Sequence, residues 1–340
     1  MRLSVLDQSA AAQGRSQADA IRQTLDLAQH CEVLGYHRFW VSEHHSHPSI
    51  VGTAPEVLMA AIAARTQTIR IGSAGVMLPH YAPLKVAEQF RVLDALAPGR
   101  IDLGVGRAPG SDQRTSALLN ADRRASDNFP QQVLELQAWV QEGAALPAGA
   151  LVTGMPEGHA GYRVHAYPQG DTAPMVWMLG SSDYGAQLAA HMSLPYAFAY
   201  FITDGQGAHE ALDIYRATFK PSALTPKPHT ALCVWALAAD TQEEAWHHFK
   251  SRERWKMDRS LGRIGALLSP DEAQREYAAN EIPGLRALRQ NALVGSAAQV
   301  TDKLKALADD LQIDELVVIT WTHSAAAQKR SYELLAQNFH

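Results

Sequence analysis

The chain lacks most features of secreted and membrane proteins. It has only two cysteines in 340 residues. Cys31 and Cys233 are far apart and fit neither a zinc-site nor a C-x-x-C spacing, so we expect two buried free thiols. The first residues turn polar too soon for a signal peptide, and no apolar run approaches the roughly 20 residues that span a bilayer. The sequence therefore predicts a cytoplasmic protein with no membrane partner.

An excess of basic charge is also absent. The formal net charge is −5 and the isoelectric point is about 6.3, which disfavours nucleic acid and anionic membranes as partners. Hydrophobic residues make up 46% and charged residues 19% of the chain, which is ordinary for a soluble enzyme. A chain of this length can bury a large core, as one large α/β domain or two smaller ones.

Strand-like apolar segments alternate with segments of helical periodicity along the chain. The predicted strands are 3–6, 38–41, 69–76, 101–105, 175–179, 195–201, 232–238 and 315–320. The predicted helices are 16–34, 54–65, 83–96, 127–141, 183–191, 210–219, one that begins at 241, and 325–339. Gly35 is a typical residue to end the first helix, and Thr241 followed by Glu244 is a capping-box pattern.

Eight strand–helix units predict a (β/α)8 TIM barrel that forms a single domain over residues 1–340. A doubly wound open sheet is the alternative, but the first unit lacks the G-x-G-x-x-G turn of such folds. The sixth strand is the weakest of the eight. Two insertions interrupt the pattern near 144–172 and 252–292, and we expect the second to form a lid.

Two segments place polar residues directly after predicted strands. Residues 40–45 read WVSEHH, and residues 103–110 read LGVGRAPG. In a parallel barrel the loops after the strands share one rim, where catalytic groups collect. One segment brings two histidines and a carboxylate to this rim, and the other brings Arg107 between glycines. Together they predict a site for an anionic cofactor beside an imidazole.

These segments belong to a longer series of short motifs. Residues 40–45, 72–79 (GSAGVMLP), 98–107 (PGRIDLGVGR) and 179–182 (LGSS) occur in that order at barrel-compatible spacing. The series closely resembles the bacterial luciferase-like, flavin-dependent monooxygenase family, in particular single-chain members related to the luciferase alpha subunit. The resemblance covers essentially the whole chain. Each motif alone is moderately specific, whereas the ordered series is strongly specific.

The resemblance implies an enzyme that binds reduced FMN as a cosubstrate, usually supplied by a separate flavin reductase. The reduced flavin reacts with O2, and the resulting flavin hydroperoxide oxidises a small organic substrate. Family members commonly dimerise through barrel helices, so the resemblance also implies a homodimer. Nothing in the sequence identifies the organic substrate.

The resemblance assigns the catalytic role to His44. An imidazole that titrates near neutrality can exchange a proton with a substrate oxygen, which is compatible with this role. Glu43 could hold this imidazole in one tautomer or pair with an arginine at the rim. At least one of the two histidines is expected to be structural, and we expect that one to be His45.

Two elements are candidates to bind the flavin phosphate. Arg107 can form bidentate bonds to phosphate, and Gly106 lets the backbone come close; the alternative for Arg107 is a salt bridge at the rim. The second element opens the helix after the fifth strand, where free amide groups favour an anion. It consists of Gly180, Ser181, Ser182 and Tyr184. Helix capping is the alternative for the serines, and Asp183 is expected to point away.

The flavin ring is expected near the third and fourth strands. The family carries a non-proline cis peptide at the position of Ala74 and Gly75, and a glycine suits such a bond. Luciferase alpha subunits have a reactive cysteine where this chain has Gly106, which makes light emission doubtful and widens the pocket. Weaker candidates for the pocket walls follow the third and eighth strands: Pro79, His80, Tyr81, Trp321 and His323.

Three other functions stay open at this stage. A deazaflavin could replace FMN on the same barrel. A metal-dependent barrel hydrolase could use His45 and His47, which have the spacing of two ligands, although no carboxylate follows the last strand. The third alternative is a flavin-binding protein without catalysis. The residues themselves predict no metal.

Overall fold

The computed structural model describes residues 1–120, 122, 124–148 and 155–339. Its centre is a closed barrel of parallel strands in the order β6-β5-β4-β3-β2-β1-β9-β7, and β6 pairs with β7 to close the ring. The barrel strands are β1 (Arg2–Asp7), β2 (Arg38–Val41), β3 (Arg70–Met77), β4 (Ile101–Gly106), β5 (Met175–Gly180), β6 (Tyr196–Phe198), β7 (Thr230–Ala239) and β9 (Glu315–Ile319). The predicted (β/α)8 barrel is therefore confirmed.

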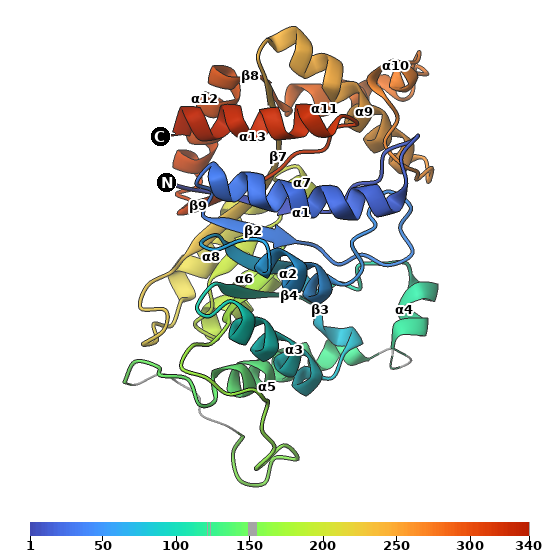
Figure 1. The fold of residues 1–340 in the computed structure, drawn as a ribbon. Helices are drawn as coiled ribbons and strands as arrows, with labels where there is room; N and C mark the ends of the chain where they lie inside the picture. Colours follow the sequence, from blue (N-terminus) through green and yellow to red (C-terminus); the bar gives the residue numbers. More distant parts are fainter. Residues whose placement is uncertain (121, 123, 149–154, 340) are drawn as a thin grey trace.

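Helices surround the barrel, and α1 and α13 run side by side near the two chain ends (Figure 1). The larger helices are α1 (Gln17–Val33), α2 (Pro55–Ala63), α3 (Pro83–Leu96), α5 (Phe129–Gln141), α6 (Asp183–His191), α8 (Ala208–Thr218), α9 (Gln242–Ser260), α11 (Ile282–Gln290), α12 (Ala297–Asp310) and α13 (Ala325–Phe339). Shorter elements are η1 (Leu78–His80), α4 (Gln113–Leu119), η2 (Ala125–Asn128), α7 (Tyr200–Thr203) and α10 (Pro270–Ala273).

The predicted ends of the first and seventh helices are confirmed. Gly35 follows the end of α1 with φ +80°, a left-handed conformation that glycine adopts without strain. At the start of α9, the Thr241 side chain accepts a hydrogen bond from the Glu244 amide. Both cysteines are buried and free, also as predicted.

Two strand predictions need correction. The sixth strand is only Tyr196–Phe198, and the chain then turns into α7, so residues 199–201 are not strand. The bond from the Ala199 amide to the Gly180 carbonyl is the last of the β5–β6 ladder, and the helical turn of α7 begins directly after it. A further strand, β8 (Leu293–Ser296), was not predicted. It pairs with the outer half of β7 from Ala236 onward and so extends the sheet beyond the barrel.

Alternate residues of the strands fill two apolar layers. On β7, Ala231, Cys233, Trp235 and Leu237 belong to the cluster inside the barrel. The residues between them, such as Leu232 and Val234, pack against the surrounding helices. Because both faces of a parallel strand are buried, its sequence is apolar throughout. Trp235 pairs in register with Ile319, the last residue of β9, and so lies at the carboxyl end of the barrel.

A network of buried charges fills the opposite, amino-terminal end of the barrel. Arg38 donates from Nη1 to Asp102 at 2.7 Å and from Nε to Glu315 at 2.9 Å. Arg70 adds a contact to Asp102 at 2.6 Å. Burial alone would raise the pKa of Asp102, but the two arginines outweigh it and hold this pKa below its usual value. The network stabilises the end of the barrel remote from the predicted site.

The insertion at 252–292 is largely ordered. Its first residues extend α9 to Ser260, and α10 and α11 follow. The backbone of Leu267 bonds to the loop after β1, with its amide 2.8 Å from the Ala11 carbonyl. Trp255 donates from Nε1 to Ser49 Oγ at 2.8 Å. The segment therefore packs against the loops that follow β1 and β2, at the carboxyl end of the barrel.

The other insertion, 144–172, is described only in part, because residues 149–154 lie outside the described structure.

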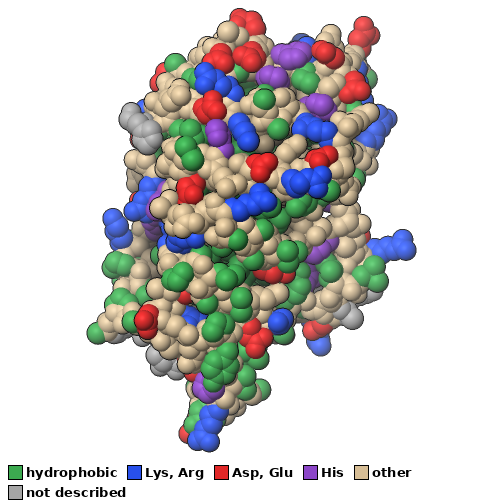
Figure 2. All heavy atoms as spheres, in the orientation of Figure 1, with side chains coloured by type: hydrophobic (Ala, Val, Ile, Leu, Met, Phe, Trp, Pro, Cys, Tyr) green, Lys and Arg blue, Asp and Glu red, His purple; other side chains and the backbone are tan. Residues whose placement is uncertain are grey.

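Among the described residues, no helix is both long and apolar enough to cross a membrane. On the face shown in Figure 2, Lys and Arg side chains are interspersed with Asp and Glu.

Candidate functional site

The predicted histidines lie at the carboxyl end of β2. Val41 ends the strand and pairs with Ser73 of β3. Ser42 and Glu43 follow as buried residues, and His44 and His45 are half-buried. The His44 amide donates to the Gly52 carbonyl at 3.1 Å, which holds this turn against the loop that leads to α2. The segment thus enters the rim beside the end of β3, as predicted.

Glu43 binds His45 and not His44, so the expected pairing with His44 or an arginine is wrong. Glu43 Oε1 is 2.7 Å from His45 Nε2 and accepts a hydrogen bond from the Tyr81 hydroxyl at 2.6 Å. Glu43 Oε2 accepts from the Met77 amide at 3.0 Å. A buried carboxylate needs such partners, because desolvating an unpaired charge is costly. Glu43 therefore joins the end of β2 to the end of β3, and His45 is one of its partners.

His44 has a different environment. Its Nδ1 lies 3.2 Å from Ser42 Oγ, and its Nε2 makes no hydrogen bond to any described residue. Burial lowers the pKa of His44 to about 4, with smaller contributions from His47, Arg259 and His45. The imidazole is therefore neutral at pH 7, which corrects the expectation that it titrates near neutrality. A neutral ring with one free nitrogen can still donate or accept one hydrogen bond.

The lowered pKa of His44 predicts a contribution to acid sensitivity. Between pH 6.5 and about 4 the unfolded chain binds a proton at this histidine and the folded chain does not. The free energy of unfolding therefore falls as the pH falls through this window. We expect His44→Gln to lose less thermal stability than the wild type when the pH is lowered from about 7.5 to about 5. Equal losses of melting temperature would contradict the assigned burial.

The two predicted phosphate elements lie next to each other. The guanidinium of Arg107, just after β4, is 4.0 Å from the ring centre of Tyr184 on α6. Arg107 is exposed and forms no ion pair with a carboxylate of any described residue, so the predicted alternative of a rim salt bridge is not found. Ser182 is the N-cap residue of α6, but its side chain makes no capping bond. Asp183 accepts a bond from the Tyr184 amide at 2.8 Å.

Glycines have two different roles between β3, β4 and β5: one allows close packing and the other borders open space. The Ala74–Gly75 peptide is cis, as in the family that the sequence resembles. A Cβ atom on Gly75 would lie 2.3 Å from Leu179 Cδ1 and 2.8 Å from the Gly104 carbonyl oxygen. The packing there therefore requires glycine. Gly106 is different, because a Cβ atom would meet only Met77 Sδ, at 3.7 Å. Space beside Gly106 is thus open, in agreement with the wider pocket predicted.

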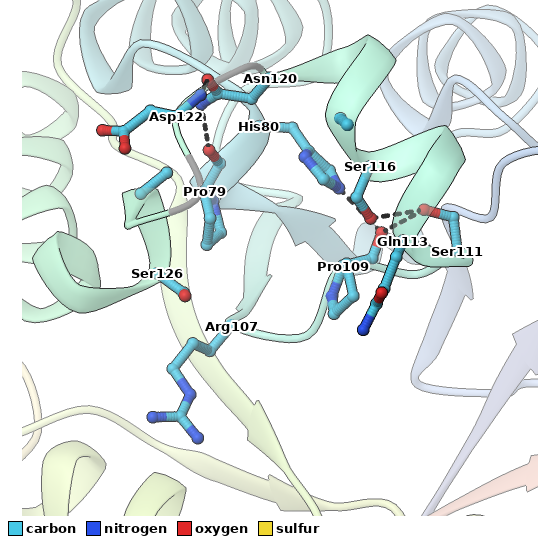
Figure 3. Close-up of a pocket in the computed structure, with 12 residues that line it drawn as sticks. Pro79, His80, Arg107, Pro109, Ser111, Gln113, Ser116, Asn120, Asp122 and Ser126 are labelled. Atoms are coloured by element: carbon cyan, nitrogen blue, oxygen red, sulfur yellow. Dashed lines mark hydrogen bonds between the residues drawn. The ribbon is translucent and has the colours of Figure 1, made fainter.

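A pocket of about 430 Å³ opens beside Arg107. It lies between η1, the loop after β4, α4 and η2, and the Arg107 side chain extends away from the other labelled side chains (Figure 3). Pro79 and His80 line this pocket, as expected for pocket walls, and His80 Nε2 is 2.8 Å from the Pro109 carbonyl. The glycines at 75 and 180 do not line it. Of the predicted cofactor-binding residues, Arg107 lines this pocket and the others do not.

The other weak candidates have structural contacts. Tyr81 holds Glu43, as described above. Trp321 is buried and packs edge-on against Trp255, with ring centres 4.8 Å apart. His323 Nε2 is 2.9 Å from the Gln13 carbonyl. Trp255 was not predicted to lie near the site. Its hydrogen bond to Ser49 holds α9 over the loop that carries Ser49.

The cations of α9 were not predicted to lie near the site. Arg252, Lys256 and Arg259 are spaced by four and three residues, which places them on one face of the helix. This spacing was visible in the sequence, but nothing there indicated that the face turns toward the barrel. Within the described ranges, no three His, Cys, Asp or Glu side chains come together as a metal site. His45 binds Glu43, and His47 instead faces His44 with ring centres 6.2 Å apart.

A closed parallel barrel with polar loops at its carboxyl end is an enzyme architecture, and comparison with known proteins identifies its class. The family model for luciferase-like monooxygenases matches residues 1–314. The chain belongs to the luciferase-like monooxygenase family. It is therefore an oxidoreductase of the monooxygenase type, and the predicted resemblance is confirmed.

Full-length relatives support this membership. A luciferase-like monooxygenase of Escherichia coli strain K12 is 39% identical over 334 residues, covering 97% of this chain and 95% of the relative. An N-acetyl-S-alkylcysteine monooxygenase of Bacillus subtilis strain 168 is 38% identical over 342 residues, covering 99% and 97%.

Solved structures have the same fold. The crystal structure of apo-MsnO8 superposes with a TM-score of 0.87 at 35% identity, covering 99% of this chain and 98% of that one. The oxygenating constituent of 3,6-diketocamphane monooxygenase from Pseudomonas putida, in complex with FMN, gives a TM-score of 0.73 at 21% identity. It covers 99% of this chain and 97% of that one, and at this identity it supports the fold alone.

Proposed function

We propose that this protein uses reduced FMN and O2 to oxygenate a small organic substrate. The observation that carries the proposal is the position of Arg107. Its guanidinium has no carboxylate partner in the described structure and lies on Tyr184, beside the start of α6. A planar cation next to a helix amino terminus is suited to bind the phosphate of a nucleotide cofactor. Among the relatives' structures, one contains FMN on the same fold.

The residues fit a flavin in two parts. Arg107, Tyr184 and the segment Gly180–Ser182 would bind the phosphate, and Ala74, Gly75 and Gly106 would border the ring. The open space at Gly106 supports a planar group at that position. Reduced flavin, when bound, supplies two electrons. With these electrons one atom of O2 is reduced to water, and the other atom is added to the substrate. A separate flavin reductase would regenerate it.

His44 is the proposed catalytic residue. Its Nε2 makes no hydrogen bond within the described structure, and Ser42 fixes the ring from the other side through Nδ1. A neutral imidazole held in this way can take a proton at one nitrogen while it donates from the other. The lowered pKa keeps His44 in its neutral form at pH 7, so one protonation state carries the reaction over the physiological range.

Two structural proposals accompany this function. We propose that the chain forms a single domain and that its segment 252–292 acts as a lid. Trp255 and Leu267 attach this segment to loops at the carboxyl end of the barrel.

We also propose a homodimer formed through barrel helices. Val57 on α2 and Val92 and Leu96 on α3 support it, because these apolar side chains are exposed.

Cofactor titration is the direct test of this function. Oxidised FMN, reduced FMN and a deazaflavin are titrated into the full chain, and substrates are then screened with the form that binds. We expect reduced FMN to bind and to support oxygenation when O2 is present. Preference for the deazaflavin would favour the alternative cofactor, and binding without turnover across the screen would favour a flavin-binding protein. A metal-dependent hydrolytic activity would contradict the proposal.

Replacing Arg107 tests the phosphate site separately. Arg107→Ala is expected to weaken reduced-FMN binding by about 1.5–3 kcal/mol, the size of a charge-assisted hydrogen bond. Riboflavin lacks the phosphate and is expected to lose much less. Arg114→Ala is the matched control, because Arg114 is an exposed arginine on the nearby α4. Equal losses for FMN and riboflavin would show that Arg107 does not bind the phosphate.

A further inference from the structure

One face of α9 carries three positive charges. Arg252, Lys256 and Arg259 follow one another at intervals of about one helical turn. The charges act on each other: burial lowers the pKa of Lys256, and Arg252 and Arg259 lower it further. Like charges one turn apart destabilise a helix. We call these three residues the α9 basic face.

Arg252 is the least exposed of the three, with 7% of its surface accessible. Its guanidinium carbon lies 4.1 Å from the ring centre of Trp235. It forms no hydrogen bond and no ion pair with any residue that the structure describes. A buried cation without an anionic partner is costly, so such groups are usually paired. Stacking on Trp235 offsets only part of this cost.

Among the described residues, one carboxylate forms an ion pair with the basic face, and it belongs to the residue that follows α7. Asp204 Oδ1 is 2.5 Å from Lys256 Nζ and also acts on Arg252 over a longer distance. Arg259 has no ion pair with a described residue and lies over Trp255, with its guanidinium carbon 5.4 Å from the ring centre. Three cations thus share one carboxylate, and the face keeps an excess of positive charge.

The basic face borders the barrel interior at its carboxyl end. Trp235 belongs to the cluster inside the barrel and lies level with the last residue of β9. A cavity of about 40 Å³ opens here, lined in part by Trp235, Arg252, Asp204 and Asn291. At the other end of the face, Arg259 lies over Trp255, whose ring centre is 6.4 Å from that of His47. His47 in turn faces His44, with ring centres 6.2 Å apart. The face therefore runs from this cavity toward the proposed catalytic histidine.

The basic face is separate from the proposed phosphate site. Arg107 follows β4 and stacks on α6, which follows β5. Trp235 is on β7, and β6 lies between β5 and β7 in the barrel. The two groups of cations therefore approach the carboxyl end of the barrel from different sides. One can hold the cofactor phosphate while the other remains available for a second anion.

We propose that the α9 basic face binds a carboxylate of the substrate, with Arg252 as its principal partner, so that the substrates are small organic acids with an oxidisable group. This inference rests on the proposed monooxygenase function, because the substrate must lie between this face and His44. Arg252 forms charge-assisted hydrogen bonds to the carboxylate. The bound acid then supplies the negative charge that no described residue places in an ion pair with Arg252.

Binding of an acid and its amide tests the proposal without turnover. (Benzylthio)acetate and (benzylthio)acetamide have the same shape, but only the acetate carries a negative charge. They are titrated by calorimetry into the full chain, with and without FMN. We expect the wild type to prefer the acid. Arg252→Met is expected to weaken acid binding by about tenfold to a hundredfold and to leave amide binding unchanged.

Two further variants complete the test. Arg254→Gln is the matched control, because Arg254 is on another side of α9 and pairs with Asp258; it should bind the acid like the wild type. Arg259→Met removes an exposed cation of the basic face, and its acid binding should weaken whether or not Arg252→Met folds. Arg252→Met itself should keep or gain thermal stability, because an apolar side chain replaces an unpaired buried charge.

The outcomes separate this inference from the proposed function. FMN affinity should be unchanged in Arg252→Met, and a loss of FMN binding there would assign the basic face to the cofactor phosphate and overturn the inference. The inference also fails if the wild type shows no preference for acids over amides in a panel of alkylthio and arylthio acids. Normal acid binding without flavin-dependent turnover would contradict the proposed function, but it would still support a carboxylate-binding site on the α9 basic face.

Discussion

Arg38→Ala is expected to destabilise the protein by about 3–5 kcal/mol, the usual cost of breaking a buried ion pair. Arg38 is buried and contacts two carboxylates that have no exposure, Asp102 and Glu315. Its removal leaves Asp102 with Arg70 and the Trp40 indole, and leaves Glu315 with Ser4 and His229. Both carboxylates stay buried with less compensating charge. The measurement is the midpoint of urea unfolding at neutral pH.

The control for Arg38 is an exposed arginine in a similar pair. Arg22 binds Asp19 at 2.5 Å on the surface of α1, with 64% and 40% of the two side chains exposed. Exposed pairs contribute about 0–1 kcal/mol, so Arg22→Ala should change the midpoint little. If the two variants lose the same stability, the buried network does not stabilise the barrel as its geometry indicates.

The loss in Arg38→Ala should shrink in acid. The Glu315 pKa is lowered to about 2, since the hydrogen bond from His229 and the charge of Arg38 outweigh its burial. A carboxylate with a lowered folded-state pKa stabilises the fold above its unfolded pKa, and this stability is lost as the pH falls toward the folded value. Without Arg38 the folded pKa of Glu315 rises, so acid removes less stability from the variant than from the wild type, and their unfolding midpoints should converge as the pH falls.

Most of the barrel was predictable because its strands are buried on both faces. Continuous apolar runs such as 232–238 cannot be mistaken for exposed segments. The error at 199–201 has a local cause: Tyr200, Phe201 and Ile202 favour strands by propensity, but here they form the first turn after β6. The strand β8 was missed because it has only four residues and two of them are Gly295 and Ser296.

The position of the site residues along the chain was predictable, but their partners were not. Strand ends share one rim in a barrel, so 42–45, 74–75 and 107 could be placed there from spacing alone. The pairing of Glu43 with His45 depends on Tyr81 and the Met77 amide, which β3 brings beside it. Such a contact between neighbouring strands is set by their register and by side-chain rotamers, which no local pattern records.

The chemical state of His44 also required the structure. The sequence suggests an imidazole with an ordinary pKa, whereas burial and the cations around it lower that pKa to about 4. One of these cations, Arg259, is more than two hundred residues away in the chain. The α9 basic face illustrates the same limit, because its spacing is local but its partners Trp235 and Asp204 come from other elements.

His44→Ala is expected to slow substrate oxygenation by about 10²–10⁴-fold, the range of general acid–base catalysis. The fold and most of the FMN affinity should remain, because His44 Nε2 has no hydrogen bond to any described residue and Arg107 is unchanged. Reduced flavin would still react with O2, so hydrogen peroxide release per flavin oxidised should rise. Both products are measured in the same reaction, with the substrate that the screen identifies.

His45→Ala is the matched control for this prediction. It removes one of the three partners of the buried Glu43 carboxylate, so it should lower the melting temperature more than His44→Ala does. Its effect on oxygenation should be smaller, because His45 Nε2 is already bound at 2.7 Å. Unchanged coupled turnover in His44→Ala would leave this histidine a structural residue. A loss of turnover in His45→Ala alone would move the proton-transfer role to the Glu43–His45 pair.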